Sequence, residues 1–409
     1  MAASINLIIT SSFLCVLLFE SGGLCESDVL HIETYAITEL DVPGLYIFGD
    51  SLVDFGNNNY LDTLARANFP YNGIDFPTGP TGRFCNGKNV ADFLAEKVGL
   101  PSPPPYLSLV SESKNLSSTN ATVTGVSFAS GGSGVFNGSE ALDPSTISLP
   151  EQVDYYSLVY DQLVQQLGLD GTRTHLAKSL FLLVIGSNDL FNYFNIDSKL
   201  PAQYTVQQYV DRMVSTLKPL LKQMYGLGAR KFVVSGVGVI GCCPAQRKPN
   251  NNSECNLEAN YGSTTYNDGL KALLNELKLE SSDMHYTYFD TYNVMSDLIQ
   301  RPETYGTKYI VTSCRGGFRA FLRVPRNSVD LEKKRITEIK EACCGRGNLK
   351  ADVPCVQWFG ADYCPNRKDH LFWDLYHPTE STYNIFASFL YNGSQQVTTP
   401  MNVEQLVNI

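Results

Sequence analysis

Five apolar stretches, each ending in glycine, serine, asparagine or aspartate, alternate with segments of helical periodicity along this chain. Apolar runs that stop at turn residues are typical of strands buried on both faces. Strands that alternate with amphipathic helices predict a three-layer α/β/α sandwich around a mostly parallel sheet. The predicted strands are 44–50, 122–130, 180–187, 231–236 and 285–290, and helical patterns cover 90–98, 204–225 and 261–279.

A serine, a glycine and an asparagine directly follow three of the predicted strands. Ser51 comes after the first, Gly131 after the second and Asn188 after the third. Ligands of open parallel sheets bind beyond the carboxyl ends of the strands. These positions are therefore the first candidates for chemistry.

Charge and length limit the class of protein. The 409 residues carry a formal net charge of -10, with a pI near 5.1. Nucleic-acid binding depends on clustered Lys and Arg, so a nucleic-acid partner is not expected. A hydrophobic share of 43% and a charged share of 18% are those of a globular chain rather than a disordered one.

Residues 1–25 are typical of a secretory signal peptide. The segment 5–19 is apolar apart from Asn6 and a few small hydroxyl residues, and small residues follow it. A membrane span needs roughly 20 apolar residues, and no other run in the chain is long enough. We therefore expect a secreted protein of the extracellular space or cell wall, with residues 26–409 forming a single domain.

Acceptor sequences for N-glycans and the use of cysteine agree with export. Eleven cysteines are present, and the nine that follow residue 25 suit disulfides in an oxidising compartment. Zinc is the competing interpretation, but no C-x-x-C pair or nearby histidine pair is present, so no metal is expected. The N-x-Ser/Thr acceptors are Asn115, Asn120, Asn137, Asn251 and Asn392.

Ser51 opens a polar turn, 54–59, at the end of the first predicted strand. A hydroxyl there faces the crevice at the strand end, near backbone N–H groups that can bind an oxyanion. Taken alone, a serine after an aspartate at a strand end is more often a helix N-cap than a nucleophile. The G-x-S-x-G hydrolase elbow is absent from the chain.

Asp374 and His377 form the second cluster, within Phe372-Trp-Asp-Leu-Tyr-His-Pro378. Residues three apart on a helical turn are neighbours, so the carboxylate can orient the imidazole. A histidine held in this way is a competent general base for a serine hydroxyl. His370 is the nearest rival, but it has no acid at that spacing.

Two glycine- and asparagine-containing turns complete the candidate site. The first is 127–134, around Gly131, and the second is 186–189, around Asn188. A glycine lets a backbone N–H approach a substrate closely, and an asparagine side chain supplies a neutral donor. Taken singly, each motif is more often ordinary turn chemistry.

A glycine pattern at 236–241 fits the dinucleotide fingerprint G-x-G-x-x-G after a strand. That fingerprint needs a helix to open at the glycines, and here Cys242-Cys-Pro244 and an asparagine-rich run follow instead. Nucleotide binding is therefore not expected.

In this order the four clusters resemble the four blocks of the SGNH or GDSL hydrolase superfamily, and most closely the plant-type GDSL esterase/lipases. The first block is Phe48-Gly-Asp-Ser-Leu-x-Asp-x-Gly-Asn-Asn58 and the last is Phe372-Trp-Asp-x-x-His-Pro-Thr379. Segments 82–87 and 342–345 are similar to accessory motifs of the group. The resemblance extends from about residue 45 to about residue 390.

The resemblance implies a role for each residue. Ser51 corresponds to the nucleophile, His377 to the base and Asp374 to its orienting acid. The oxyanion hole corresponds to the Ser51 N–H, the Gly131 N–H and the Asn188 side chain, with Gly132 as the neighbouring alternative to Gly131.

The fold implied is a flavodoxin-like sandwich with a central five-stranded parallel sheet. The activity implied is hydrolysis of acyl esters, small or polymer-borne, through an acyl-enzyme and without metal or cofactor. Two alternatives remain open: a polysaccharide O-acetylesterase, and a catalytically idle modifier or binding protein of the family. Acyl length, leaving alcohol, disulfide pairing and oligomeric state stay open.

Two segments stand apart from this pattern. Residues 101–120 are rich in Pro and Ser and predict an exposed loop. Residues 307–336 carry eight Lys or Arg against two acids, and they interrupt a junction that family members usually make directly. We hypothesise that 307–336 is translated intron or another gene-model artefact, since its removal leaves eight cysteines after residue 25. If it belongs to the protein, it is expected to be a surface loop.

Overall fold

The central sheet of the computed structural model contains four parallel strands side by side in the order β1-β2-β3-β4, with a short antiparallel strand, β11, at the β4 edge. The structure describes residues 42–112, 121–137, 141–302, 309–313, 319–323 and 336–409. Four of the five predicted strands are confirmed. They correspond to β1 (Leu45–Gly49), β2 (Leu180–Val184), β3 (Lys231–Ser235) and β4 (His285–Phe289). The fifth strand of the observed sheet is β11 (Thr398–Thr399).

The remaining predicted strand, 122–130, differs from the expectation. Its first residues belong to a short helix, α3 (Ala121–Thr124), and the rest runs extended beside β1 without forming a regular strand. Ile47 N donates to Val126 O at 3.0 Å, and Phe128 N donates to Ile47 O at 2.8 Å, the pattern of a parallel partner. With this segment included beside β1, the strand order is that of a flavodoxin-like sheet. The direction in which successive strands are added to the sheet reverses between β1 and β2.

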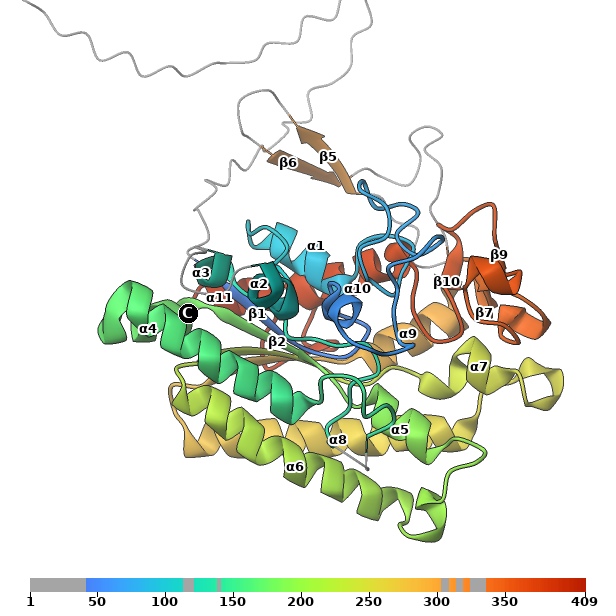
Figure 1. Ribbon diagram of the computed structural model, residues 1–409, viewed down its shortest axis with the longest axis horizontal. Helices are drawn as coiled ribbons and strands as arrows, with labels where there is room; N and C mark the ends of the chain where they lie inside the picture. The colour runs from blue at the N-terminus through green and yellow to red at the C-terminus, as the bar shows by residue number, and fades with distance from the viewer. Residues whose placement is uncertain (1–41, 113–120, 138–140, 303–308, 314–318, 324–335) are drawn as a thin grey trace, which may run out of the picture. The chain divides into compact units, whose positions relative to one another are not determined.

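Helices cover both faces of the sheet (Figure 1). Along β1, Tyr46 and Phe48 pack with the helices of one face, while Leu45 and Ile47 pack with those of the other. This alternation follows from the two-residue period of a strand. One face carries α4 (Leu149–Lys178), α6 (Val206–Gly226) and α8 (Leu257–Glu280), and the other carries α1 (Val90–Lys97), α9 (Thr291–Gln300), α10 (Glu380–Asn392) and α11 (Val403–Val407).

The three predicted helices are confirmed as α1, α6 and α8. Helix α8 begins four residues before the predicted start because the Asn256 side chain caps it, accepting the N–H groups of Glu258 and Ala259. The loop predicted for 101–120 is wrong in part. It contains a helix, α2 (Tyr106–Glu112), since Tyr106 and Leu109, three apart, are buried in the core.

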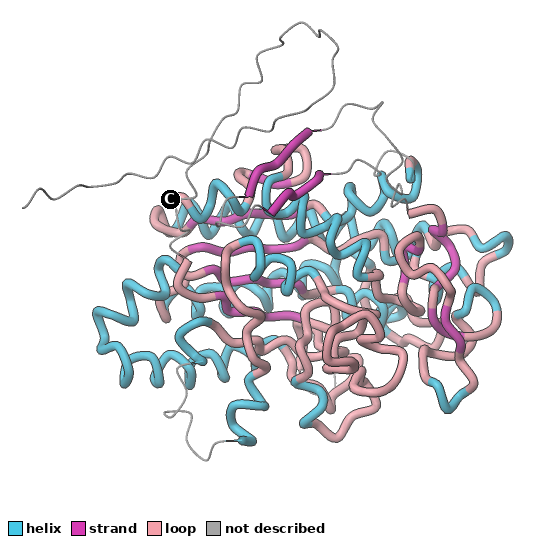
Figure 2. Tube along the Cα trace, turned by 90° about the horizontal axis from the view of Figure 1, so that it is seen from above, coloured by secondary structure: helices cyan, strands magenta, loops and turns pink. Residues whose placement is uncertain are grey.

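The strands of the central sheet lie together as one group (Figure 2). The remaining elements that the structure describes are short helices and strands outside that sheet. They are α5 (Ser187–Tyr193), α7 (Pro244–Arg247), η1 (Asn57–Tyr60), η4 (Leu200–Ala202), η5 (Ile240–Cys242), η6 (Asn251–Ser253), η8 (Asn348–Lys350), η9 (Gln357–Phe359), β5 (Tyr309–Ser313), β6 (Arg319–Arg323), β7 (Glu338–Ala342), β8 (Cys344–Gly345), β9 (Asp362–Tyr363) and β10 (His370–Phe372).

Three disulfides join six of the cysteines that the structure describes. They are Cys242–Cys255, Cys343–Cys364 and Cys344–Cys355. Cys85 and Cys243 are free thiols, and both are buried. The expectation of disulfides is confirmed, and the last two close short loops around the strands β8 and β9.

Several predictions fall on residues that the structure does not describe. The predicted signal peptide, 1–25, and the predicted acceptors Asn115 and Asn120 lie outside the described residues. Of the other acceptors, Asn137 and Asn392 are exposed, and Asn251 begins η6. Within 307–336 the structure describes the antiparallel pair β5 and β6, together with Ile336, which is buried. No helix among the described residues is both long enough and apolar enough to cross a bilayer.

Candidate active site

Ser51 lies two residues beyond β1, in a turn rather than at the start of a helix. The turn is fixed because Asp50 N donates to Val184 O at 3.1 Å at the end of β2. Gly49 has a φ of +146°, and a Cβ there would come within 2.1 Å of Val184 O. Only glycine allows β1 to end so close to β2. The helix-cap interpretation of Ser51 is therefore wrong.

The side chains of Ser51, His377 and Asp374 form one hydrogen-bonded line. Ser51 Oγ lies 2.7 Å from His377 Nε2. His377 Nδ1 lies 2.8 Å from both carboxylate oxygens of Asp374. A hydroxyl, an imidazole and a carboxylate in this sequence match the geometry needed to activate a serine.

The pairing of Asp374 with His377 does not come from a helix. Both residues lie in a loop of bends between β10 and α10. Asp374 Oδ1 accepts the backbone N–H groups of Tyr376 and His377, each at 2.9 Å, which closes the loop on the carboxylate. The prediction that the two side chains meet is correct, although its helical reason is wrong.

The charge of the imidazole and three donors stabilise the Asp374 carboxylate. Burial raises the pKa of Asp374, but the charge and hydrogen bond of His377 and the backbone N–H groups of Tyr376 and His377 outweigh it, so the pKa lies below its ordinary value. Asp374 is therefore ionised at neutral pH and can stabilise an imidazolium at His377.

The accessory segment 82–87 places an aromatic ring beside the imidazole of His377. The ring of Phe84 lies 5.2 Å from the ring of His377, centroid to centroid. The preceding Arg83 is buried and makes two 2.7 Å hydrogen bonds to Asp92, on α1. This bidentate pair holds the segment that carries Phe84.

Two of the three predicted oxyanion donors have free hydrogens at the strand ends. Among the described residues the Ser51 N–H has no hydrogen-bond acceptor. Asn188, on α5 after β2, uses one amide hydrogen to donate from Nδ2 to Ser133 O at 2.8 Å, which leaves its second hydrogen available. Ser51 and Asn188 both line the same cavity.

The third predicted donor is occupied. Gly131 N donates to Asp54 Oδ2 at 3.0 Å. The next residue, Gly132, lines the cavity, and its N–H has no acceptor among the residues described. Gly132 has a φ of +84°, a conformation that favours glycine.

Asp54, Asn57 and Asn58 hold the loop that carries these glycines. Asn57 Nδ2 donates to the carbonyls of Ser127 and Ala129, each at 2.8 Å, and Asn58 Nδ2 donates to that of Gly131 at 2.8 Å. These side chains belong to the first family block, but no local pattern in the chain indicates that their partners lie 70 to 73 residues away.

Gln152 is a further residue that supports the site and that no pattern in the sequence indicates. Its amide exchanges two 2.8 Å hydrogen bonds with the backbone of Gly49 and donates to Ser133 Oγ at 3.0 Å. One side chain from α4 thus joins the end of β1 to the glycine turn.

Two buried carboxyl groups lie under the site. Burial raises the pKa of Asp50 to about 7, against opposing effects of the Leu52 N–H and the His377 charge. Burial raises the pKa of Asp189 to about 6, against hydrogen bonds from backbone N–H groups that include Val135. Perturbed carboxyl groups of this kind concentrate at functional sites.

A cavity of about 830 Å³ opens at Ser51 and His377. It lies at the carboxyl ends of β1–β4, as expected for an open parallel sheet. Its volume is that of a typical small-ligand site. Gly236 and Gly238 of the dinucleotide-like pattern line this cavity. The helix that follows them, α7, has four residues, so the pattern lacks the helix that a phosphate needs.

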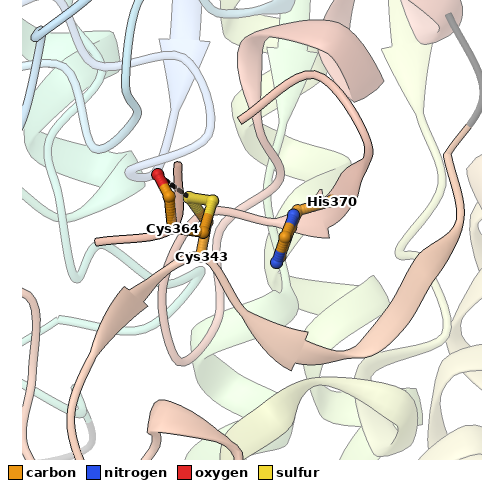
Figure 3. A group of neighbouring side chains, drawn as sticks. All are labelled: Cys343, Cys364 and His370. Carbon is orange, nitrogen blue, oxygen red and sulfur yellow. Dashed lines mark hydrogen bonds between the residues drawn. A yellow bond between two sulfur atoms is a disulfide. The ribbon is translucent and has the colours of Figure 1, made fainter. Parts of the chain in front are cut away.

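One group of side chains has atoms close enough to suggest a metal site. Sulfur and nitrogen atoms of Cys343, Cys364 and His370 lie within 4.8 Å of one another. Figure 3 shows the two sulfurs joined in a disulfide beside the imidazole. The sulfurs of a disulfide are not thiolate ligands, so this group does not form a metal site in its oxidised state. His370 Nδ1 contacts Asp369, at 2.6 Å, and not Ser51.

The fold and this site define a class: the hydrolases that carry a serine, a histidine and an acid on a flavodoxin-like sandwich. The chain belongs to the GDSL-like Lipase/Acylhydrolase family, which matches it over residues 45–390. It is a carboxylic ester hydrolase.

Two relatives from Arabidopsis thaliana illustrate the match. The chain is similar to the GDSL esterase/lipase At5g55050, with 43% identity over 90% of each chain. It is also similar to the GDSL esterase/lipase At3g50400, with 38% identity over 88% of this chain and 90% of the relative.

Proposed function

We propose that the protein is a secreted serine esterase or lipase that hydrolyses acyl esters through a covalent acyl-enzyme. The observation that carries the proposal is the 2.7 Å contact between Ser51 Oγ and His377 Nε2. That distance is within the range for direct proton transfer between a nucleophile and its base. The ionised Asp374 on the far side of the ring supports the same assignment.

In the first half of the reaction, Ser51 Oγ attacks the ester carbonyl carbon while its proton moves to His377 Nε2. The carbonyl oxygen becomes an oxyanion, held by the Ser51 N–H, an amide hydrogen of Asn188 and one glycine N–H. His377 then gives its proton to the leaving alcohol as the bond between the acyl carbon and the alcohol oxygen breaks.

Water completes the cycle. It gives a proton to His377 and attacks the acyl carbon, and the bond to Ser51 Oγ then breaks as the proton returns to the serine. Asp374 keeps its negative charge throughout and stabilises the imidazolium. Every step as written uses groups of this chain and water.

We assign the glycine donor to Gly132 rather than Gly131. The Gly131 N–H is 3.0 Å from Asp54 Oδ2, and an N–H bonded to a carboxylate is not free for a substrate oxygen. Gly132 is adjacent, lines the cavity and has no acceptor among the described residues. Gly131 then has a positioning role through Asp54.

Three features support export as part of the proposal. The segment 1–25 has the composition of a signal peptide, and three disulfides suit an oxidising compartment. The acceptors Asn137 and Asn392 are exposed, as glycan sites must be. Release of a glycosylated protein that begins after residue 25, from cells expressing the full chain, tests this part.

The test of the chemistry is the Ser51→Ala protein on a p-nitrophenyl ester. We expect loss of nearly all turnover, while near-normal turnover would refute the assignment of the nucleophile. A fluorophosphonate probe, which labels an activated serine, separates this proposal from an idle modifier or binding protein. Acetylated polysaccharide, run beside simple esters, tests the O-acetylesterase alternative.

The segment 307–336 stays a separate proposal, that it is absent from the mature message. Sequencing the spliced transcript decides it, and a message that still encodes 307–336 rules the proposal out. The site does not depend on this outcome, since none of its residues lies in 307–336.

A further inference from the structure

The cavity at Ser51 has an open side and a closed side. On the open side its lining includes Leu142 and Ile196, which are 41% and 96% exposed. On the other side it extends between the sheet and helices α9 and α10, where the lining residues are at most 9% exposed. We name this closed part the inner arm; its lining residues are Leu182, Phe289, Met295, Tyr383, Phe386 and Leu390.

The six side chains of the inner arm are apolar apart from the hydroxyl of Tyr383. Ser235 and Thr291 line the cavity nearby, and their hydroxyls hydrogen-bond to each other at 2.6 Å. Tyr383, Phe386 and Leu390 lie three and four positions apart, so they share one face of α10. The ring of Phe386 lies 6.3 Å from that of Phe289, on β4, and 6.4 Å from that of Tyr383. Leu182 on β2 and Met295 on α9 line the same space.

Among the described residues that line the cavity, two carry a buried polar side-chain atom without a protein partner. These atoms are Asp50 Oδ2 and the hydroxyl of Tyr383. Burial raises the pKa of Asp50 to about 7, so the group carries a proton over much of the acidic to neutral range. A protonated carboxyl at the entrance does not prevent an apolar group from passing.

The chemistry of the ester determines which side each half occupies. The alcohol must leave and water must take its place at the acyl carbon before the second half-reaction. The alcohol therefore requires the open side. The acyl group stays attached to Ser51 from the first half-reaction to the second, so it can occupy the buried side.

We propose that the inner arm binds the acyl chain and makes the enzyme selective for acyl groups of medium length. This inference rests on the proposed function, because it takes Ser51 as the point of attachment. From Tyr383 to Leu390 the α10 face spans about 10 Å, at about 1.5 Å per residue. An extended chain advances about 1.2 Å per bond, so the arm holds roughly eight bonds.

The experiment is a series of p-nitrophenyl esters from acetate to palmitate with the full-length enzyme. We expect kcat/KM to rise by up to about fourfold per added methylene until the arm is filled, near roughly eight to ten carbons, and then to level off or fall. A profile that is flat or that falls steadily from acetate overturns the inference. Turnover of acetate that Ser51→Ala abolishes would still support the proposed function.

Variants at the end of the arm locate the effect. Leu390→Phe shortens the arm and should move the peak of the profile to shorter esters by several carbons. Leu390→Ala lengthens it and should move the peak the other way, which keeps the test valid if the larger residue impairs folding. Leu279→Phe, the same substitution at an 87% exposed site on α8 outside the cavity lining, is the matched control. If all three proteins peak at the same chain length as wild type, the inner arm is not the acyl site.

Discussion

His377 Nε2 lies 2.7 Å from Ser51 Oγ, although the two residues are 326 positions apart in the chain. The serine follows the first strand of the sheet, and the histidine lies in the loop before α10. The contact forms because α1 and α10, which pack on the same face, bring the start and the end of the domain together. The four predictions below test this site and the sheet that carries it.

Asp374→Asn is expected to lower kcat by roughly 10,000-fold on a soluble ester. The asparagine amide has only one oxygen that can accept the N–H of the His377 ring. It is also uncharged, so it does not stabilise an imidazolium. The variant should fold, because the amide oxygen can still accept the N–H groups of Tyr376 and His377. Steady-state kinetics and the melting temperature, compared with wild type, check both statements. Turnover within tenfold of wild type would contradict the role of Asp374.

Asn188→Ala is expected to lower kcat by about 100- to 1,000-fold, with a smaller change in KM. The lost donor acts on charge that develops in the transition state, so the ground state is less affected. Asn384→Ala, at an exposed position on α10, is the matched control and should keep the wild-type kcat. An equal loss in both variants, or an effect confined to KM, would argue against an oxyanion contact.

Stability should fall as pH rises from about 4 to about 7. Burial raises the pKa of Asp50 to about 7 and those of Asp54 and Asp189 to about 6, whereas unfolded aspartate titrates near about 3.9. The folded protein therefore binds more protons than the unfolded chain in this window, and the free energy of unfolding declines with pH until about 7.

The pKa shift of Asp374 changes the free energy of unfolding with pH in the opposite direction. Its pKa is lowered in the fold, so its contribution is present at neutral pH and is lost on acidification below the unfolded value. Urea unfolding at pH 5, 6, 7 and 8 measures the slope, and Asp50→Asn, which removes one raised group, should make it shallower. A slope that is unchanged in Asp50→Asn would show that this group does not contribute.

Gly49→Ala is expected to destabilise the fold by about 3 kcal/mol or more. The φ of +146° is unfavourable for alanine, and its Cβ would meet Val184 O at 2.1 Å. Gly226→Ala, at the end of α6, is the control, since its Cβ would meet nothing within 4 Å. That substitution should be neutral or stabilising by a few tenths of a kcal/mol. Equal unfolding free energies for the two variants would contradict the strained approach of β1 to β2.

Periodicity in the chain predicted most of the sheet and its helices, because burial on both faces leaves continuous apolar runs that can be recognised locally. It failed at 122–130 and 101–120. The first segment is apolar but obtains its hydrogen bonds from β1 through an irregular extended path. In the second, the buried Tyr106 and Leu109 are hidden among Pro and Ser, and only their packing against the core makes the segment helical.

The sequence by itself determined the fold class, the polar residues at the strand ends and the acid three residues before the histidine, because these depend on local spacing and burial. The tertiary structure decided which groups meet. It brought His377 to Ser51, formed the Asp374 loop without a helix and committed the Gly131 N–H to Asp54, which leaves Gly132 beside the cavity. The physical reason is that a hydrogen bond depends on distances of a few tenths of an ångström between atoms far apart in the chain, and residue type alone does not contain them.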